Sequence, residues 1–103
     1  MKILLVEPGK HPRAADIPHT LEKMQETVGG YIQVVCPWRD PVALVCDEEG
    51  LLKNLAFNRV VAPGVAIFGT FFLCGISDED FTDLPDELAQ KYSALLDAMQ
   101  KEA

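Results

Sequence analysis

Blocks of apolar residues separated by turn signals run along this chain and predict both strands and helices. The Ile, Leu and Val run at 2–7 is closed by Pro8-Gly9, which is typical of a buried strand followed by a turn. Apolar residues then recur at helical spacing, at Leu21, Met24 and Val28. This spacing predicts an amphipathic helix over 19–28, which Gly29 ends.

Three more β-rich runs follow, at 31–36, 42–46 and 65–74. The last is the longest, so we expect it to form a central strand. Gly69 inside it predicts a bulge or a close approach by another group. Residues 51–62 carry apolar side chains without a regular period, and we expect an irregular segment that leads into a short strand at 59–62.

The end of the chain, 84–100, again has apolar residues at helical spacing: Leu88, Tyr92, Leu95, Leu96 and Met99. This pattern predicts a second amphipathic helix. The order of elements predicts a single α+β domain over 1–103, with a mixed β-sheet and both helices packed on one face. The expected core consists of Leu4, Val6, Leu21, Met24, Val28, Val34, Leu44, Phe71, Leu73, Leu88, Leu95 and Leu96.

Composition narrows the class of protein. The 103 residues, 49% of them apolar, suffice for one independently folding domain. The apolar start at 3–6 is too short for a secretion signal or a membrane span, so we expect a cytoplasmic protein without a membrane partner. No motif calls for a cofactor.

The net charge of −7 disfavours direct binding to nucleic acid, because a phosphate footprint needs a basic face. An acidic face can instead attract basic protein surfaces. Asp78, Glu79 and Asp80 are therefore a candidate acidic surface, with helix capping and solvation as the simpler interpretation. Neither this cluster nor the acidic turn at 47–50 has the spacing of a calcium loop.

The three cysteines, Cys36, Cys46 and Cys74, lie at least ten residues apart inside apolar runs. No pair has the spacing of a zinc site or a disulfide framework. We therefore predict three buried, reduced thiols and no metal site.

Several residues are candidates for contact with a ligand or partner. The two glycines before Tyr31 follow a helix, so they favour chain reversal over phosphate binding, with ligand contact through Tyr31 as the alternative. Trp38 and Arg39 lie between prolines, and we expect an exposed loop there, which makes the two residues candidates for contact with a partner.

The pair Asn58-Arg59 is of most interest because an arginine among apolar residues needs partners. It either pairs structurally with Glu7, Asp47 or Glu48, or it faces a cleft and grips an anion. Catalysis is the less favoured interpretation, since His11 and His19 have no Ser or Cys at nucleophile spacing and no catalytic residue is identified.

Five different short motifs follow one another along the chain, at 7–10, 28–32, 47–50, 58–59 and 69–71. In order and spacing they resemble the domain of unknown function 3846, a family of small bacterial and phage proteins, over about 2–84. The resemblance implies a cytoplasmic accessory protein of bacteria, phages or mobile elements, with a role in countering host defence among the options.

We therefore expect a non-enzymatic binding module for a host protein or a small anionic ligand, with self-association as an option. Its candidate contact residues are Tyr31, Trp38, Arg39, Asn58, Arg59, Gly69 and Thr70. An alternative is an acidic mimic of nucleic acid that blocks a DNA- or RNA-handling protein, and a small enzyme of unknown reaction is the third option.

Overall fold

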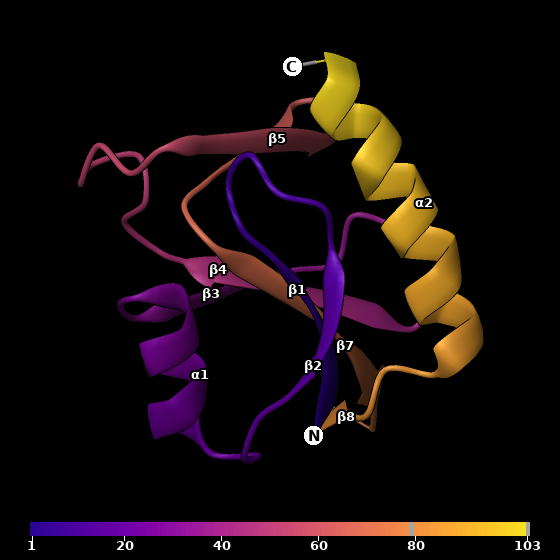
Figure 1. The fold of residues 1–103 in the computed structure, drawn as a ribbon. Helices are drawn as coiled ribbons and strands as arrows, with labels where there is room; N and C mark the ends of the chain where they lie inside the picture. The colour runs from indigo at the N-terminus through magenta and orange to yellow at the C-terminus, as the bar shows by residue number, and fades with distance from the viewer. Residues whose placement is uncertain (79, 103) are drawn as a thin grey trace.

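The computed structural model describes residues 1–78 and 80–102, with side chains described as far as Met99. Within these residues the chain forms a compact domain of eight strands and two helices (Figure 1). The elements are β1 (Lys2–Val6), β2 (Arg13–Asp16), α1 (Leu21–Val28), β3 (Ile32–Val35), β4 (Val42–Asp47), β5 (Phe57–Ala62), β6 (Val65–Phe68), β7 (Phe71–Ser77), β8 (Asp80–Thr82) and α2 (Asp86–Glu102). The α+β class predicted from the sequence is confirmed.

The main sheet has the strand order β2-β1-β7-β4-β3, and β8 pairs with β7 outside this path. β5 and β6 form a separate two-stranded sheet. We expected a mixed sheet, but every pairing between described strands is antiparallel. The links within β1–β2, β3–β4 and β7–β8 are short loops, and parallel neighbours would need longer crossovers.

The two helices cover opposite faces of the main sheet, so the prediction that both pack on one face is wrong (Figure 1). On one face, α1 packs through Met24 and Val28. On the other face lie α2 and the β5–β6 hairpin. The reason is visible in β4, which is buried at all six positions and therefore needs cover on both sides.

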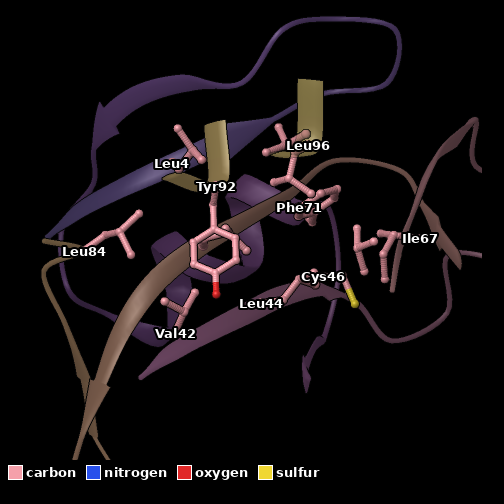
Figure 2. Close-up of a cluster of buried hydrophobic side chains, with 12 residues drawn as sticks. Leu4, Val42, Leu44, Cys46, Ile67, Phe71, Leu84, Tyr92 and Leu96 are labelled. Carbon is pink, nitrogen blue, oxygen red and sulfur yellow. The ribbon is translucent and has the colours of Figure 1, made fainter. Parts of the chain in front are cut away.

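The larger core cluster lies on the α2 side of the sheet (Figure 2). Its labelled members are Leu4, Val42, Leu44, Cys46, Ile67, Phe71, Leu84, Tyr92 and Leu96. Leu4 of β1 and Leu44 of β4 both sit opposite Leu73 of β7, so three strands contribute one continuous apolar layer. Burying such side chains supplies most of the driving force for folding.

The predicted core is correct except at two exposed positions, with Leu88 and Leu95 only half-buried. Leu21 is exposed because only Met24 and Val28 of the short helix α1 are buried against the sheet. Val34 is exposed because β3 is the last strand of the main sheet.

The glycine that ends α1 acts as predicted, and a threonine that we did not predict caps the start of the helix. The side chain of Thr20 accepts a hydrogen bond from the Lys23 amide at 3.2 Å, which caps the N-terminus. Gly29 follows the helix with a φ of 89°, a left-handed conformation that glycine adopts without strain.

The predicted strand at 65–74 is divided at Gly69, which has a φ of 85°. Residues before it belong to β6 in the small sheet, and residues after it form β7, the central strand of the main sheet. A methyl group at Gly69 would lie 2.7 Å from Cδ1 of Leu55, so the expected close approach is present as well. β5 begins earlier than predicted, and both β2 and β8 lie in segments where we expected no strand.

A candidate interaction surface

The motif residues Asn58 and Arg59 lie in the interior of the molecule. The side-chain amide of Asn58 donates to the carbonyl oxygen of Val6 at 3.1 Å and to that of Gly69 at 2.8 Å. It thereby joins β5 to the end of β1 and to the link between β6 and β7. This buried amide fixes the position of the small sheet on the large one.

Arg59 is fully buried, with 0% of its surface exposed. Its Nε donates to Oδ1 of Asn58 at 2.8 Å, its Nη1 to the Leu96 carbonyl at 2.6 Å, and its Nη2 to the Lys10 carbonyl at 2.8 Å. Burial lowers the pKa of Arg59, and the nearby carboxylate of Asp97 opposes that shift. The guanidinium thus connects β5, the loop after β1 and the last turns of α2.

These contacts favour the structural alternative for the pair, and none of them involves the carboxylates we expected. Glu7 is paired with Arg13 and Asp47 with Lys53, while Glu48 is exposed. Neither Asn58 nor Arg59 is accessible to a ligand or a protein partner in this structure.

The glycine and acidic motifs meet around Asp47, whose side chain is fully buried. Lys53 Nζ lies 2.8 Å from its Oδ2, and the Glu49 amide donates to its Oδ1 at 2.8 Å. Burial alone would raise the pKa of Asp47, but the hydrogen bonds from Lys53 and Glu49 bring it below its usual value. A methyl group at Gly30 would lie 2.5 Å from Lys53 Nζ, so this motif leaves room for the ion pair.

Gly50 and Gly69 have similar packing roles. A methyl group at Gly50 would lie 2.6 Å from the Phe68 carbonyl oxygen, and the Gly69 amide donates to the Ala56 carbonyl at 2.7 Å. Thr70 is half-buried between β6 and β7. The motifs that stand out in the sequence therefore hold the two sheets together.

Trp38 is half-buried and packs against α2, so the expected exposed loop is present only at Arg39. The ring of Trp38 lies 4.5 Å from that of Tyr92. The Tyr92 hydroxyl donates to Asp40 at 2.7 Å, and Lys91 Nζ lies 2.7 Å from the same carboxylate oxygen. Burial, together with this hydrogen bond, raises the pKa of Tyr92 to about 12, so the hydroxyl remains a donor at neutral pH.

Of the three cysteines, Cys46 and Cys74 are buried as predicted, but Cys36 is exposed. It follows β3 at the edge of the sheet, where no described strand covers it. Burial raises the pKa of Cys46 to about 11 and that of Cys74 to about 12, so both are poor nucleophiles.

The acidic surface proposed from the sequence is only partly described. Asp78 and Asp80 are exposed, and Glu79 lies outside the described residues. Asp80 accepts a hydrogen bond from the Phe81 amide at 2.8 Å and lies 3.5 Å from His19. In the described part of the chain, no three His, Cys, Asp or Glu side chains are grouped so that they could hold a metal ion.

Of the predicted contact residues with large side chains, Arg39 and Tyr31 are exposed, and Tyr31 is 68% exposed. The Tyr31 side chain lies at the surface beside the acidic turn. It lines a shallow hollow of about 240 Å³ together with Gln25, Gly30, Glu49 and Lys53. Glu49 belongs to the acidic turn that follows β4, so the Tyr31 and 47–50 motifs meet at the surface as well as in the interior.

An apolar surface that sequence reasoning missed lies next to this turn. It consists of Leu51, Leu52, Phe57, Val60, Ala66 and Phe68, and we call it the apolar surface. Leu51 and Leu52 are 68% and 84% exposed. A pair of adjacent leucines without a helical or strand period was the available signal, because such a pair has no common buried face.

Strand pairing brings these side chains together. Phe57 lies opposite Phe68 with ring centroids 5.5 Å apart, and Val60 lies opposite Ala66. Since cross-strand partners share a face, all four side chains lie on the outer face of the β5–β6 hairpin, away from the buried Ile67. Leu51 lies beside the hairpin, because it lines a hollow of about 130 Å³ with Ala66, Ile67 and Phe68. Leu52 is its neighbour in the chain.

These observations define a small antiparallel α+β domain with a polar internal network and an external apolar surface. The model of the family described as Domain of unknown function (DUF3846) matches residues 1–97. The chain therefore belongs to this family, as its motifs indicated. No curated protein and no solved structure matches the chain.

Neither helix, over the residues described, is long and apolar enough to cross a membrane.

Proposed function

We propose that this chain is a non-enzymatic protein-binding module that contacts its partner through the apolar surface. The observation that carries the proposal is the exposure of Leu51, Leu52, Phe57 and Val60 around one hairpin. Contiguous exposed apolar side chains are disfavoured on soluble proteins unless they bind something.

Packing within the chain does not account for the exposure. Leu52 is 84% exposed and contributes little to either core cluster, whereas Leu44 and Leu73 already fill the interior. Replacing Leu52 by a polar residue would therefore cost little stability. Its exposure is consistent with a role in binding, where burial against a partner supplies the free energy.

Charge around the apolar surface favours a particular partner chemistry. Glu48 and Glu49 are exposed immediately before Leu51, and the chain carries a net charge of −7. A complementary partner presents an apolar patch bordered by Lys or Arg. We propose a host protein of this kind as the partner, in the bacterial cytoplasm that the family resemblance implies, with phage or mobile-element origin as part of the proposal.

The proposal is tested by site-specific photo-crosslinking in the bacterium that carries the gene. A benzophenone amino acid replaces Leu52 in one variant and Glu22, which is exposed on α1, in the control. We expect one protein adduct of defined mass from the Leu52 position and none from Glu22. Identical adduct patterns from both positions, or no adduct from either, would contradict the proposed surface.

Two further variants separate contact from misfolding. Phe57→Asp places a charge on the apolar surface, and Asp16→Asn changes an exposed residue on β2 at the far end of the strand order. We expect the first to abolish the adduct at Leu52 while the circular dichroism spectrum is unchanged. The second should leave the adduct intact.

A further inference from the structure

The edge strand β3 differs from the opposite edge, β2, in its lack of charge. From Gly29 to Trp38 the sequence contains no charged residue, whereas β2 begins with Arg13 and ends with Asp16. Natural proteins protect exposed sheet edges with charges, prolines or bulges. Within the described part of the chain, β3 has β4 on one side and no strand on the other.

The hydrogen-bonding phase of β3 follows from its pairing with β4. The Glu48 amide donates to the Tyr31 carbonyl at 2.8 Å, and Cys46 Sγ lies 3.7 Å from the Gln33 carbonyl. Carbonyls at odd-numbered positions therefore point toward β4. Because the direction alternates along a strand, the backbone groups of Ile32 and Val34 point outward, which gives two donors and two acceptors at the open edge.

We propose that this edge binds a second copy of the chain, with β3 paired antiparallel to β3 across a two-fold axis at Gln33. In this register Ile32 of one copy lies opposite Val34 of the other, and each such pair exchanges two backbone hydrogen bonds. All four outward groups find a partner, and the main sheet continues from one copy into the next.

Charge favours this occupant despite the acidity of the chain. The paired segments carry no charge, so no like charges face each other along the seam. Antiparallel pairing also places Tyr31 of one copy opposite Val35 of the other. The exposed Arg39 beyond Val35 then lies at the same end as Glu48 and Glu49 of the partner copy, because Glu48 bonds to Tyr31.

The register can be tested by a disulfide across the two-fold axis. Gln33 is exposed and would face its own copy, so Gln33→Cys, made with Cys36→Ser, should form an intermolecular disulfide under mild oxidation. The matched control is Ala14→Cys with Cys36→Ser, on the other edge strand. We expect a reducible dimer from the first and monomer from the second. Dimer from both, or from neither, would overturn the register.

Sedimentation equilibrium of the unmodified chain tests the association itself. We expect a dimer that Val34→Pro converts to monomer, since proline removes one outward donor. Val34→Lys gives the same result without altering the backbone, and a native circular dichroism spectrum shows that it folds. A monomeric wild-type chain at concentrations of about 0.1 mM would refute the proposal, given the affinities typical of weak interfaces.

The charge contact gives an independent check. Arg39→Glu should raise the dimer dissociation constant about 1.4–5-fold, the range expected for an exposed ion pair. Adding Glu48→Arg to the same chain should restore much of the affinity. An unchanged constant in Arg39→Glu would contradict the antiparallel orientation.

Discussion

The turn before β5 and the strand β5 differ in an unexpected way: the turn exposes apolar side chains, and the strand buries polar ones. The turn exposes Leu51 and Leu52, and the strand buries Asn58 and Arg59. Each buried polar group has partners within hydrogen-bond distance, which offsets the cost of removing it from water. The leucines have no comparable role in the interior. The fold thus relies on the polar pair, whereas the apolar pair belongs to the surface that we propose binds a partner.

Of the substitutions that test this comparison, replacing Arg59 should change the free energy of unfolding most. Arg59→Ala should lower the free energy of unfolding by about 3–5 kcal/mol, because it removes charge-assisted hydrogen bonds and leaves a cavity. Chemical denaturation measures the change. Arg59→Lys should recover only part of the loss, since an ammonium group cannot reach the three acceptors in the same geometry. A loss below about 1 kcal/mol in Arg59→Ala would show that the network is dispensable.

Leucine substitutions compare the interior directly with the apolar surface. Leu4→Ala should cost about 2–5 kcal/mol because Leu4 is buried in the larger core cluster. Leu52→Ala should change stability by less than about 0.5 kcal/mol. Both values come from urea unfolding of the same preparation. Similar costs at the two positions would mean that the exposed leucine supports the fold after all.

Substituting Gly69 tests how the β5–β6 hairpin is joined to the main sheet. Gly69→Ala should destabilise by about 1–3 kcal/mol, since alanine is strained at a φ of 85° and its methyl group would meet Leu55. Gly64→Ala is the matched control, because Gly64 also has a positive φ but has no atom within 4 Å of the added methyl group. The control should lose less stability, and thermal unfolding of the two variants ranks them.

The smallest expected effect is a loss of stability at alkaline pH. Burial raises the pKa of Cys46 from 9.0 to about 11, so the folded thiol remains protonated where the unfolded thiol ionises. Its contribution is fully present below about pH 9 and is lost as the pH rises toward 11. Cys46→Ala should weaken the pH dependence of the unfolding free energy between these values. An unchanged slope would mean that the thiol is accessible.

Regular periodicity accounts for the parts of the fold that the sequence predicts well. The second helix has a long periodic apolar pattern, and the strand at 42–46 is a continuous apolar run with clear boundaries. Both are present in the structure. The four residues of β2 include two alanines and two charges, which give no strand signal. Their conformation depends instead on pairing with β1, a contact that no local pattern encodes.

The candidate site was harder to predict because tertiary contacts determine which of its residues are buried and which are exposed. Arg59 resembles a ligand-binding residue in the sequence, and only the positions of Lys10 and Leu96 show that its partners are internal. For the apolar surface, the sequence suggests burial where the structure shows exposure. Phe57 and Val60 resemble core residues, and they are exposed because the hairpin has only one buried face.

The central position of β7 also determines when the sheet can be completed during synthesis. β7 lies between β1 and β4, yet it is synthesised long after β1. Leu4 therefore cannot pair with Leu73 until most of the chain has been made. Until then, the nascent main sheet consists of two separate strand pairs, β1–β2 and β3–β4, with open edges and no strand to join them. Such non-local pairing slows folding and prolongs exposure of aggregation-prone edges. Stop codons before β7 should therefore yield fragments that cannot form the native sheet.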